Sequence, residues 1–144
     1  MLWKLVIIPV IFVKTYIQSD HNTGMQKSEA GFVRNFSQVE EIPMPGGAAI
    51  RWLITHRDGA PTFSMRLITV GKGKSTPYHS HDYEHEIFVV SGKCKVTLGD
   101  AEKTASEGDF IFIPPNLRHG MTATEDMKII CIVPIKAAKE ILGE

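Results

Sequence analysis

Three of the six histidines in this chain lie in the stretch Gly73-Lys-Ser-Thr-Pro-Tyr-His79-Ser-His81-Asp-Tyr-Glu-His85-Glu86. A fourth follows in Gly108-Asp-Phe-Ile-Phe-Ile-Pro114-Pro-Asn-Leu-Arg-His119-Gly120. Neutral imidazole is the commonest metal ligand in proteins, and several imidazoles that converge on one point are typical of a metal site. We therefore predict a metal site formed by His79, His81, His85 and His119. His79 and His81 are two residues apart, so on one strand both imidazoles would leave the same face.

The chain from about Phe32 onward alternates short apolar runs with turn residues. Such runs, rich in Val, Ile and Phe, are typical of an antiparallel sandwich or barrel. They cover residues 49–55, 63–70, 86–90, 93–98, 109–113 and 127–133. Only residues 136–142 predict a helix, because Ala and Lys favour helices and Gly143 ends this segment. The sequence predicts one all-β domain, residues 32–144, with a short C-terminal helix.

The composition argues against several functions. Sixteen basic and sixteen acidic side chains cancel, and no long run of either sign occurs. We therefore expect no nucleic-acid partner and no attraction to an acidic membrane surface. Neither a Ser-His-Asp arrangement nor a phosphate-binding loop supports hydrolysis by those routes. Cys94 and Cys131 are not a Cys-x-x-Cys pair and are predicted to be buried free thiols, with a metal-facing Cys131 as the alternative.

Residues 1–31 are set apart from the predicted domain as an N-terminal extension. The apolar part of residues 1–13 is too short to span a bilayer as a helix, which needs about twenty apolar residues. Its length suits a signal-peptide core, but no convincing cleavage site follows, and Met25 offers an alternative start. We interpret the extension as a tail and expect a cytoplasmic protein. An export signal or anchor within residues 1–24 is the alternative.

The two histidine segments resemble the two signature motifs of the cupin superfamily. The first motif runs Gly, five residues, His-x-His, three or four residues, an acidic ligand, six residues, Gly. The second runs Gly, five residues, Pro-x-Gly, two residues, His, three residues, Asn. The match is close over residues 60–135. The resemblance implies a double-stranded β-helix, the jelly-roll or cupin barrel, that holds a metal in its mouth.

One ligand position departs from the family pattern. Three residues separate His85 from His81 and six separate it from Gly92, so His85 takes the place usually held by glutamate. Glu86 would break the second interval, and on a strand it points to the face opposite to His85. The chain is similar in this to small manganese-binding monocupins with four histidines. A set of three histidines plus Glu86 is the alternative.

Other positions carry weaker predictions. Asn116 stands where the second motif has glycine, and Asn tolerates the left-handed backbone of that turn. Arg66 interrupts an apolar run, and we expect a salt bridge or a surface arginine, with an anchor for a substrate anion as the alternative. Tyr83 could line the pocket rim or simply pack. His21 and His56 are expected to be solvated. The simplest core candidates are Ile87, Val89, Phe110, Phe112 and Ile129.

The resemblance also implies a cofactor and a class of function. The cofactor would be a divalent transition metal, manganese first, with iron, copper, nickel or zinc as alternatives. We hypothesise a dioxygenase-like, metal-dependent oxidoreductase that acts on a small organic molecule. A non-catalytic cupin that binds or senses a metal or small ligand is one alternative, and a metal-dependent isomerase or lyase is another. A homodimer paired through its sheets is expected.

Overall fold

The computed structural model describes residues 31–144, so the predictions for residues 1–30 lie outside the described part of the chain. Two short 3-10 helices cover Phe36–Gln38 and His56–Asp58. The strands are β1 (Ile42–Pro43), β2 (Ala48–Ile54), β3 (Phe63–Val70), β4 (His85–Leu98), β5 (Ala101–Ser106), β6 (Phe110–Ile113) and β7 (His119–Pro134), and helix α2 covers Ile135–Leu142. The predicted all-β fold with a short C-terminal helix is confirmed.

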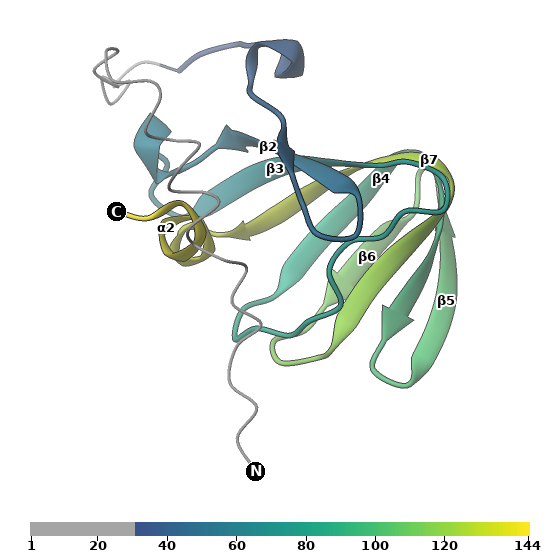
Figure 1. Ribbon diagram of the computed structural model, residues 1–144. Coiled ribbons are helices and arrows are strands. Elements are labelled where there is room, and N and C mark those ends of the chain that lie inside the picture. Colours follow the sequence, from purple (N-terminus) through teal and green to yellow (C-terminus); the bar gives the residue numbers. More distant parts are fainter. Residues whose placement is uncertain (1–30) are drawn as a thin grey trace.

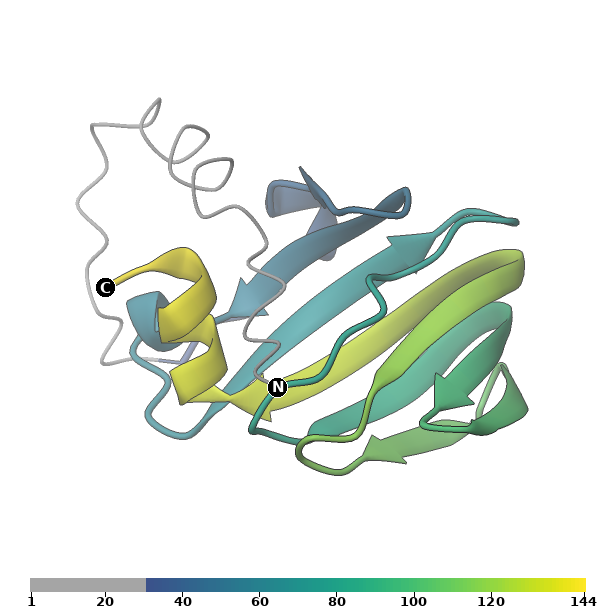
Figure 2. The same ribbon diagram turned by 60° about the horizontal axis from the view of Figure 1, so that its bottom comes forward.

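All paired strands are antiparallel, in the order β1-β2-β3-β7-β4-β5, and β6 pairs with β4. The longest strands, β4 and β7, lie side by side and pair along most of their length (Figures 1 and 2). The sheet curls into a jelly-roll barrel, and helix α2 lies at one end of it (Figure 2). Among the described residues, no helix is long and apolar enough to cross a bilayer.

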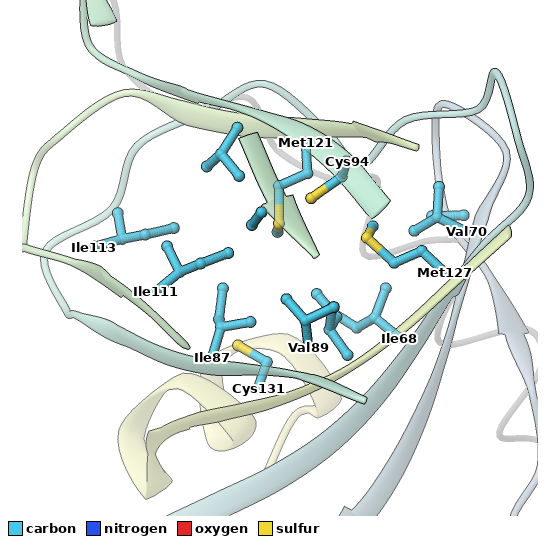
Figure 3. Packing of buried hydrophobic residues seen from close by; sticks show 14 of the residues in the cluster. Ile68, Val70, Ile87, Val89, Cys94, Ile111, Ile113, Met121, Met127 and Cys131 are labelled. Atoms are coloured by element: carbon cyan, nitrogen blue, oxygen red, sulfur yellow. The ribbon is translucent and has the colours of Figure 1, made fainter. Parts of the chain in front are cut away.

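Aliphatic and sulfur-containing side chains on the inner face of the barrel form the core (Figure 3). Val89 and Ile129 are completely buried and Ile87 nearly so, which confirms these three core predictions. The predictions for Phe110 and Phe112 are wrong, because these side chains are 84% and 61% exposed. All four residues of β6 are apolar, so the sequence does not show which face is buried. The pairing of β6 with β4 turns the two isoleucines inward instead.

The runs 86–90 and 93–98, predicted as separate, are not divided by a break at Gly92. Residues 86–90 and 93–98 belong to one continuous strand, β4, whose register against β7 shifts between Val89 and Cys94. Gly92 has a φ of +83° at this irregularity, so the glycine bends the strand instead of ending it. The sequence does not predict strand β5, because only Ala105 of its six residues is buried and the segment shows no alternation of apolar and polar residues.

Local predictions at four other positions are confirmed. Asn116 adopts the left-handed backbone, with a φ of +67°. Gly143 caps the C-terminus of α2, where its N–H donates to the carbonyl of Lys139. Cys94 and Cys131 are buried and free.

Candidate metal centre

The four candidate histidines come from three different parts of the fold. His85 is the first residue of β4 and His119 the first of β7. His79 and His81 lie in the extended segment between β3 and β4, where a strand was expected. At His79 an isolated bridge forms, in which His79 and His119 exchange backbone hydrogen bonds of 3.0 and 2.9 Å. This bridge holds the two motifs side by side.

The structure brings all four imidazoles to one place. One nitrogen from each of His79, His81, His85 and His119 lies within 4.8 Å of the others. The rings of His81 and His85 are 4.4 Å apart at their centroids and inclined by 81°, and the other close ring pairs have similar edge-to-face geometry. Glu86, in contrast, is exposed on the opposite face of β4. The geometry therefore favours four histidines over three plus Glu86.

Backbone carbonyls set the tautomers of two of these histidines. The Nδ1 of His81 lies 2.7 Å from the carbonyl of Tyr83, and the Nδ1 of His119 lies 2.8 Å from that of Leu117. A carbonyl can only accept, so each Nδ1 carries the proton and each Nε2 keeps a lone pair. The Nε2 of His119 is buried without a hydrogen-bond partner. A buried, unpartnered lone pair aimed at three other imidazoles fits a metal ion.

His85 has a different neighbourhood, formed by Arg66 and Cys131. The Nη2 of Arg66 lies 3.0 Å from the Nδ1 of His85 and donates to the Sγ of Cys131 at 2.8 Å. The same Sγ lies 3.1 Å from that Nδ1. Cys131 therefore contacts the Nδ1 of His85, and the alternative that it faces a metal stays a prediction. Tyr83 also packs at the cluster, stacked on His81 at 3.8 Å between ring centroids.

Arg66 is neither a surface residue nor part of a salt bridge, so the preferred prediction for it is wrong. Its side chain is buried, with 5% of the residue exposed. Its guanidinium carbon lies 5.2 Å from the ring centroid of Trp52. Within residues 31–144 no carboxylate pairs with it. The sequence shows a charge in an apolar strand, but only the register of β3 between β2 and β7 places that charge inside the barrel.

Burial keeps the four imidazoles neutral near pH 7. It lowers the pKa of His79 and of His81 to about 4, with a further contribution from the positive charge on neighbouring groups. Burial likewise lowers the pKa of His85 and of His119, and the Arg66 guanidinium adds to both effects. Burial raises the pKa of the Cys131 thiol. The cluster therefore offers unprotonated nitrogens, the form that binds metal ions.

These pKa shifts predict how the metal-free protein responds to acid. The folded-state pKa values of His79 and His81 lie below that of an unfolded histidine, which is near 6.5. At pH values between the two, the unfolded state therefore binds more protons than the folded state. The contribution of neutral His79 and His81 to the free energy of unfolding is complete above about pH 6.5, and it is lost as the pH falls through about 4. Urea unfolding in chelator at pH 7.5, 6.0 and 5.0 should show a falling midpoint. A His79→Gln/His81→Gln variant should show a shallower fall, and an equal slope in both proteins would refute the assignment.

His56, predicted to be solvated, is half-buried and lies apart from the cluster in the 3-10 helix His56–Asp58. Its Nδ1 is buried without a hydrogen-bond partner, and burial lowers its pKa. It takes no part in the grouping of the other four histidines. His21 lies outside the described residues.

Comparison with known proteins identifies similar chains. The family model described as "Cupin domain" matches residues 66–133. The polyketide cyclase RemF from Streptomyces resistomycificus is 28% identical, with a TM-score of 0.67 over 74% of this chain and 80% of that chain. KdgF from Halomonas sp. is 20% identical, with a TM-score of 0.64 over 73% of this chain and 94% of that chain, a likeness of fold alone.

One curated protein also shares sequence with this chain. Mannose-1-phosphate guanylyltransferase RfbM from Salmonella typhimurium is 38% identical over 66 residues, which are 44% of this chain. The matched part is only 14% of that much longer protein. The match therefore concerns one segment of the relative and not its whole length.

Proposed function

Because this chain belongs to the cupin superfamily, we propose that it binds a divalent transition metal and acts as a dioxygenase-like, metal-dependent oxidoreductase on a small organic molecule. The observation that carries the proposal is the convergence of four neutral imidazoles at the mouth of an apolar barrel. His79, His81, His85 and His119 would hold the metal. Manganese is the first candidate, and iron, copper, nickel and zinc also accept such ligands.

A bound ion would supply Lewis-acid or redox chemistry at the cluster, and the protein would supply orientation and a dry pocket. The carbonyls of Tyr83 and Leu117 orient two of the imidazoles through their Nδ1 protons. The aliphatic interior shields the inner side of the cluster from water. No carboxylate of the described residues hydrogen-bonds to the four imidazoles. This favours redox or Lewis-acid chemistry over proton transfer by a carboxylate.

A second candidate is a metal-dependent isomerase or lyase that needs no oxygen. The similarity to the polyketide cyclase RemF favours it, because that enzyme is 28% identical and the match covers 74% of this chain. A barrel that binds a metal or small ligand without turnover is the third candidate. One fold hosts all three functions, so the site chemistry has to separate them.

Metal content and oxygen uptake test the proposal. The full chain is purified without chelating resin or added metal, and bound metals are measured by elemental mass spectrometry. We expect about one manganese, iron or copper per chain, and oxygen consumption with one member of a panel of small organic molecules. Consumption should stop in the metal-free protein and return with the metal. Turnover without oxygen would favour the isomerase or lyase, and metal without turnover would favour the binding module.

We further propose that the chain forms a homodimer through the outer face of β4 and β6. Phe88 and Phe110 are directly paired there, and Val90 and Phe112 share the face. All four side chains are at least 42% exposed. Contiguous exposed aromatic residues mark interaction surfaces, and a net charge of zero does not oppose self-association.

A Phe110→Glu/Phe112→Glu variant should therefore be monomeric. The two added carboxylates of one protomer would lie against those of its partner, where desolvation and charge repulsion oppose association. Sedimentation or light scattering at matched concentration should show a mass near 32 kDa for the wild type, twice the 16.0 kDa of one chain. Val33→Glu is the control, because Val33 is fully exposed and lies outside the sheet. A dimer that survives the double substitution would place the interface elsewhere.

A further inference from the structure

Arg66 is a buried cation whose hydrogen-bonding capacity is mostly unused. A guanidinium has five N–H donors, and in the described chain only Nη2 has partners: it donates to the Sγ of Cys131 and lies 3.0 Å from the Nδ1 of His85. Nε is buried with no partner, and Nη1 donates no hydrogen bond to the described residues. Buried arginines are normally paired, so one that is 5% exposed with three free N–H groups points to a missing acceptor.

The register of the sheet places this cation inside the barrel. Arg66 lies opposite Cys131 of β7, and Cys131 in turn lies opposite Ile87 of β4. The side chains of Cys131 and Ile87 point into the barrel interior, together with that of Ile68, which is two residues further along β3 than Arg66 (Figure 3). Side chains two residues apart on a strand share a face, so Arg66 belongs to this interior face.

The side chains that contact Arg66, those of His85, Cys131 and Trp52, include no carboxylate. The guanidinium lies 3.0 Å from the ring of His85, one of the four imidazoles that converge on one place. A divalent ion would add two positive charges to this region. Buried charge without a counter-charge is costly, and no carboxylate of the described chain pairs with Arg66.

We propose that Arg66 makes the barrel interior beside the four histidines a binding subsite for the carboxylate group of a small organic ligand. Carboxylate oxygens match the planar donors of a guanidinium, and their negative charge offsets the positive charge of the site. The aliphatic side chains around the subsite would hold the rest of the ligand. This inference deepens the proposed function, on which it rests, by assigning a substrate class to the same site.

Binding of carboxylates and of their neutral amides provides the test. Acetate and benzoate are compared with acetamide and benzamide at constant ionic strength, in manganese-loaded and in metal-free protein. The readout is the fluorescence of Trp52, whose ring contacts Arg66. The chain has two tryptophans, so a Trp3→Phe background makes Trp52 the sole reporter. Metal content is measured separately in every sample, which keeps the metal proposal distinct from the carboxylate proposal.

We expect the carboxylates to bind and the amides not to bind. Arg66→Met should weaken carboxylate binding about 10- to 100-fold, the range for a lost hydrogen bond to a charged group. Arg66→Lys should retain part of the affinity, because it keeps the charge but loses the planar fork. Arg51→Met is the matched control on β2, because Arg51 pairs with Glu41 and should leave binding unchanged.

The outcomes separate the two proposals. Carboxylate binding that is equal in wild type, Arg66→Lys and Arg66→Met overturns the subsite, even where manganese is bound. No carboxylate binding to manganese-loaded wild type also overturns it. If no sample holds metal but the carboxylates still bind in an Arg66-dependent way, the metal proposal fails and the subsite stands. Should Arg66→Met not fold, the Arg66→Lys protein decides, and undiminished affinity there counts against the subsite.

Discussion

Replacing His85 by alanine is expected to lower metal affinity roughly 100- to 1000-fold. Four-ligand metal sites have apparent binding free energies of about 10–16 kcal/mol, so one ligand accounts for about 2.5–4 kcal/mol, and 1.4 kcal/mol is a factor of ten. His85 is buried, and its Nε2 lies 2.6 Å from the Nε2 of His81, so no other side chain can easily take its place. Competition with a chromophoric chelator gives the affinity, and elemental analysis gives the occupancy.

Two matched variants make this prediction decisive. Glu86→Ala should keep full metal affinity, because Glu86 is exposed on the other face of β4. His56→Ala should also keep it, because His56 lies outside the cluster. Loss of metal in Glu86→Ala together with retention in His85→Ala would show that the ligands are three histidines and a glutamate. Retention in all three variants would show that metal binds elsewhere.

Gly92→Ala is expected to destabilise the fold by about 3 kcal/mol or more. The φ of +83° at Gly92 lies in the left-handed region, where an L side chain costs about 1–3 kcal/mol. An added Cβ would also overlap the carbonyl oxygen of Asp126 and come within 2.7 Å of the Cα of Met127. Overpacking of this kind costs about another 1–3 kcal/mol. Both neighbours are backbone atoms of β7, so neither can move without disturbing the sheet.

Gly108→Ala is the control for this substitution. Gly108 has a similar φ of +87°, but a Cβ there would meet nothing within 4 Å. Its cost should therefore be the backbone strain alone, about 1–3 kcal/mol. Urea unfolding of both variants in the metal-free state measures the difference. Equal losses of stability would show that the close approach of β4 to β7 at Gly92 adds nothing to the cost of the Gly92→Ala substitution.

The histidine site was largely readable from local spacing. His79 and His81 are neighbours on an extended segment, and the second motif supplies His119 at a distance that the barrel closes. The preference for His85 over Glu86 rested on motif intervals and on alternation, and the structure places the two side chains on opposite faces of β4. The part played by Arg66 was not readable, because a cation in an apolar run looks the same whether it faces solvent or the core.

The sequence predicts features of single strands, whereas the register in which the strands pair is set by the tertiary structure. Composition and alternation were enough to predict an all-β domain, the helix before Gly143 and the residues that share a strand face. The left-handed turn at Asn116 followed from the resemblance to the second motif. Composition and alternation could not tell which face of β6 is buried, and the phenylalanines there are exposed. They also could not show that β4 continues through Gly92 or that Arg66 faces His85. Alternation is a property of one strand, whereas the choice of the inner face depends on which neighbours pair with it.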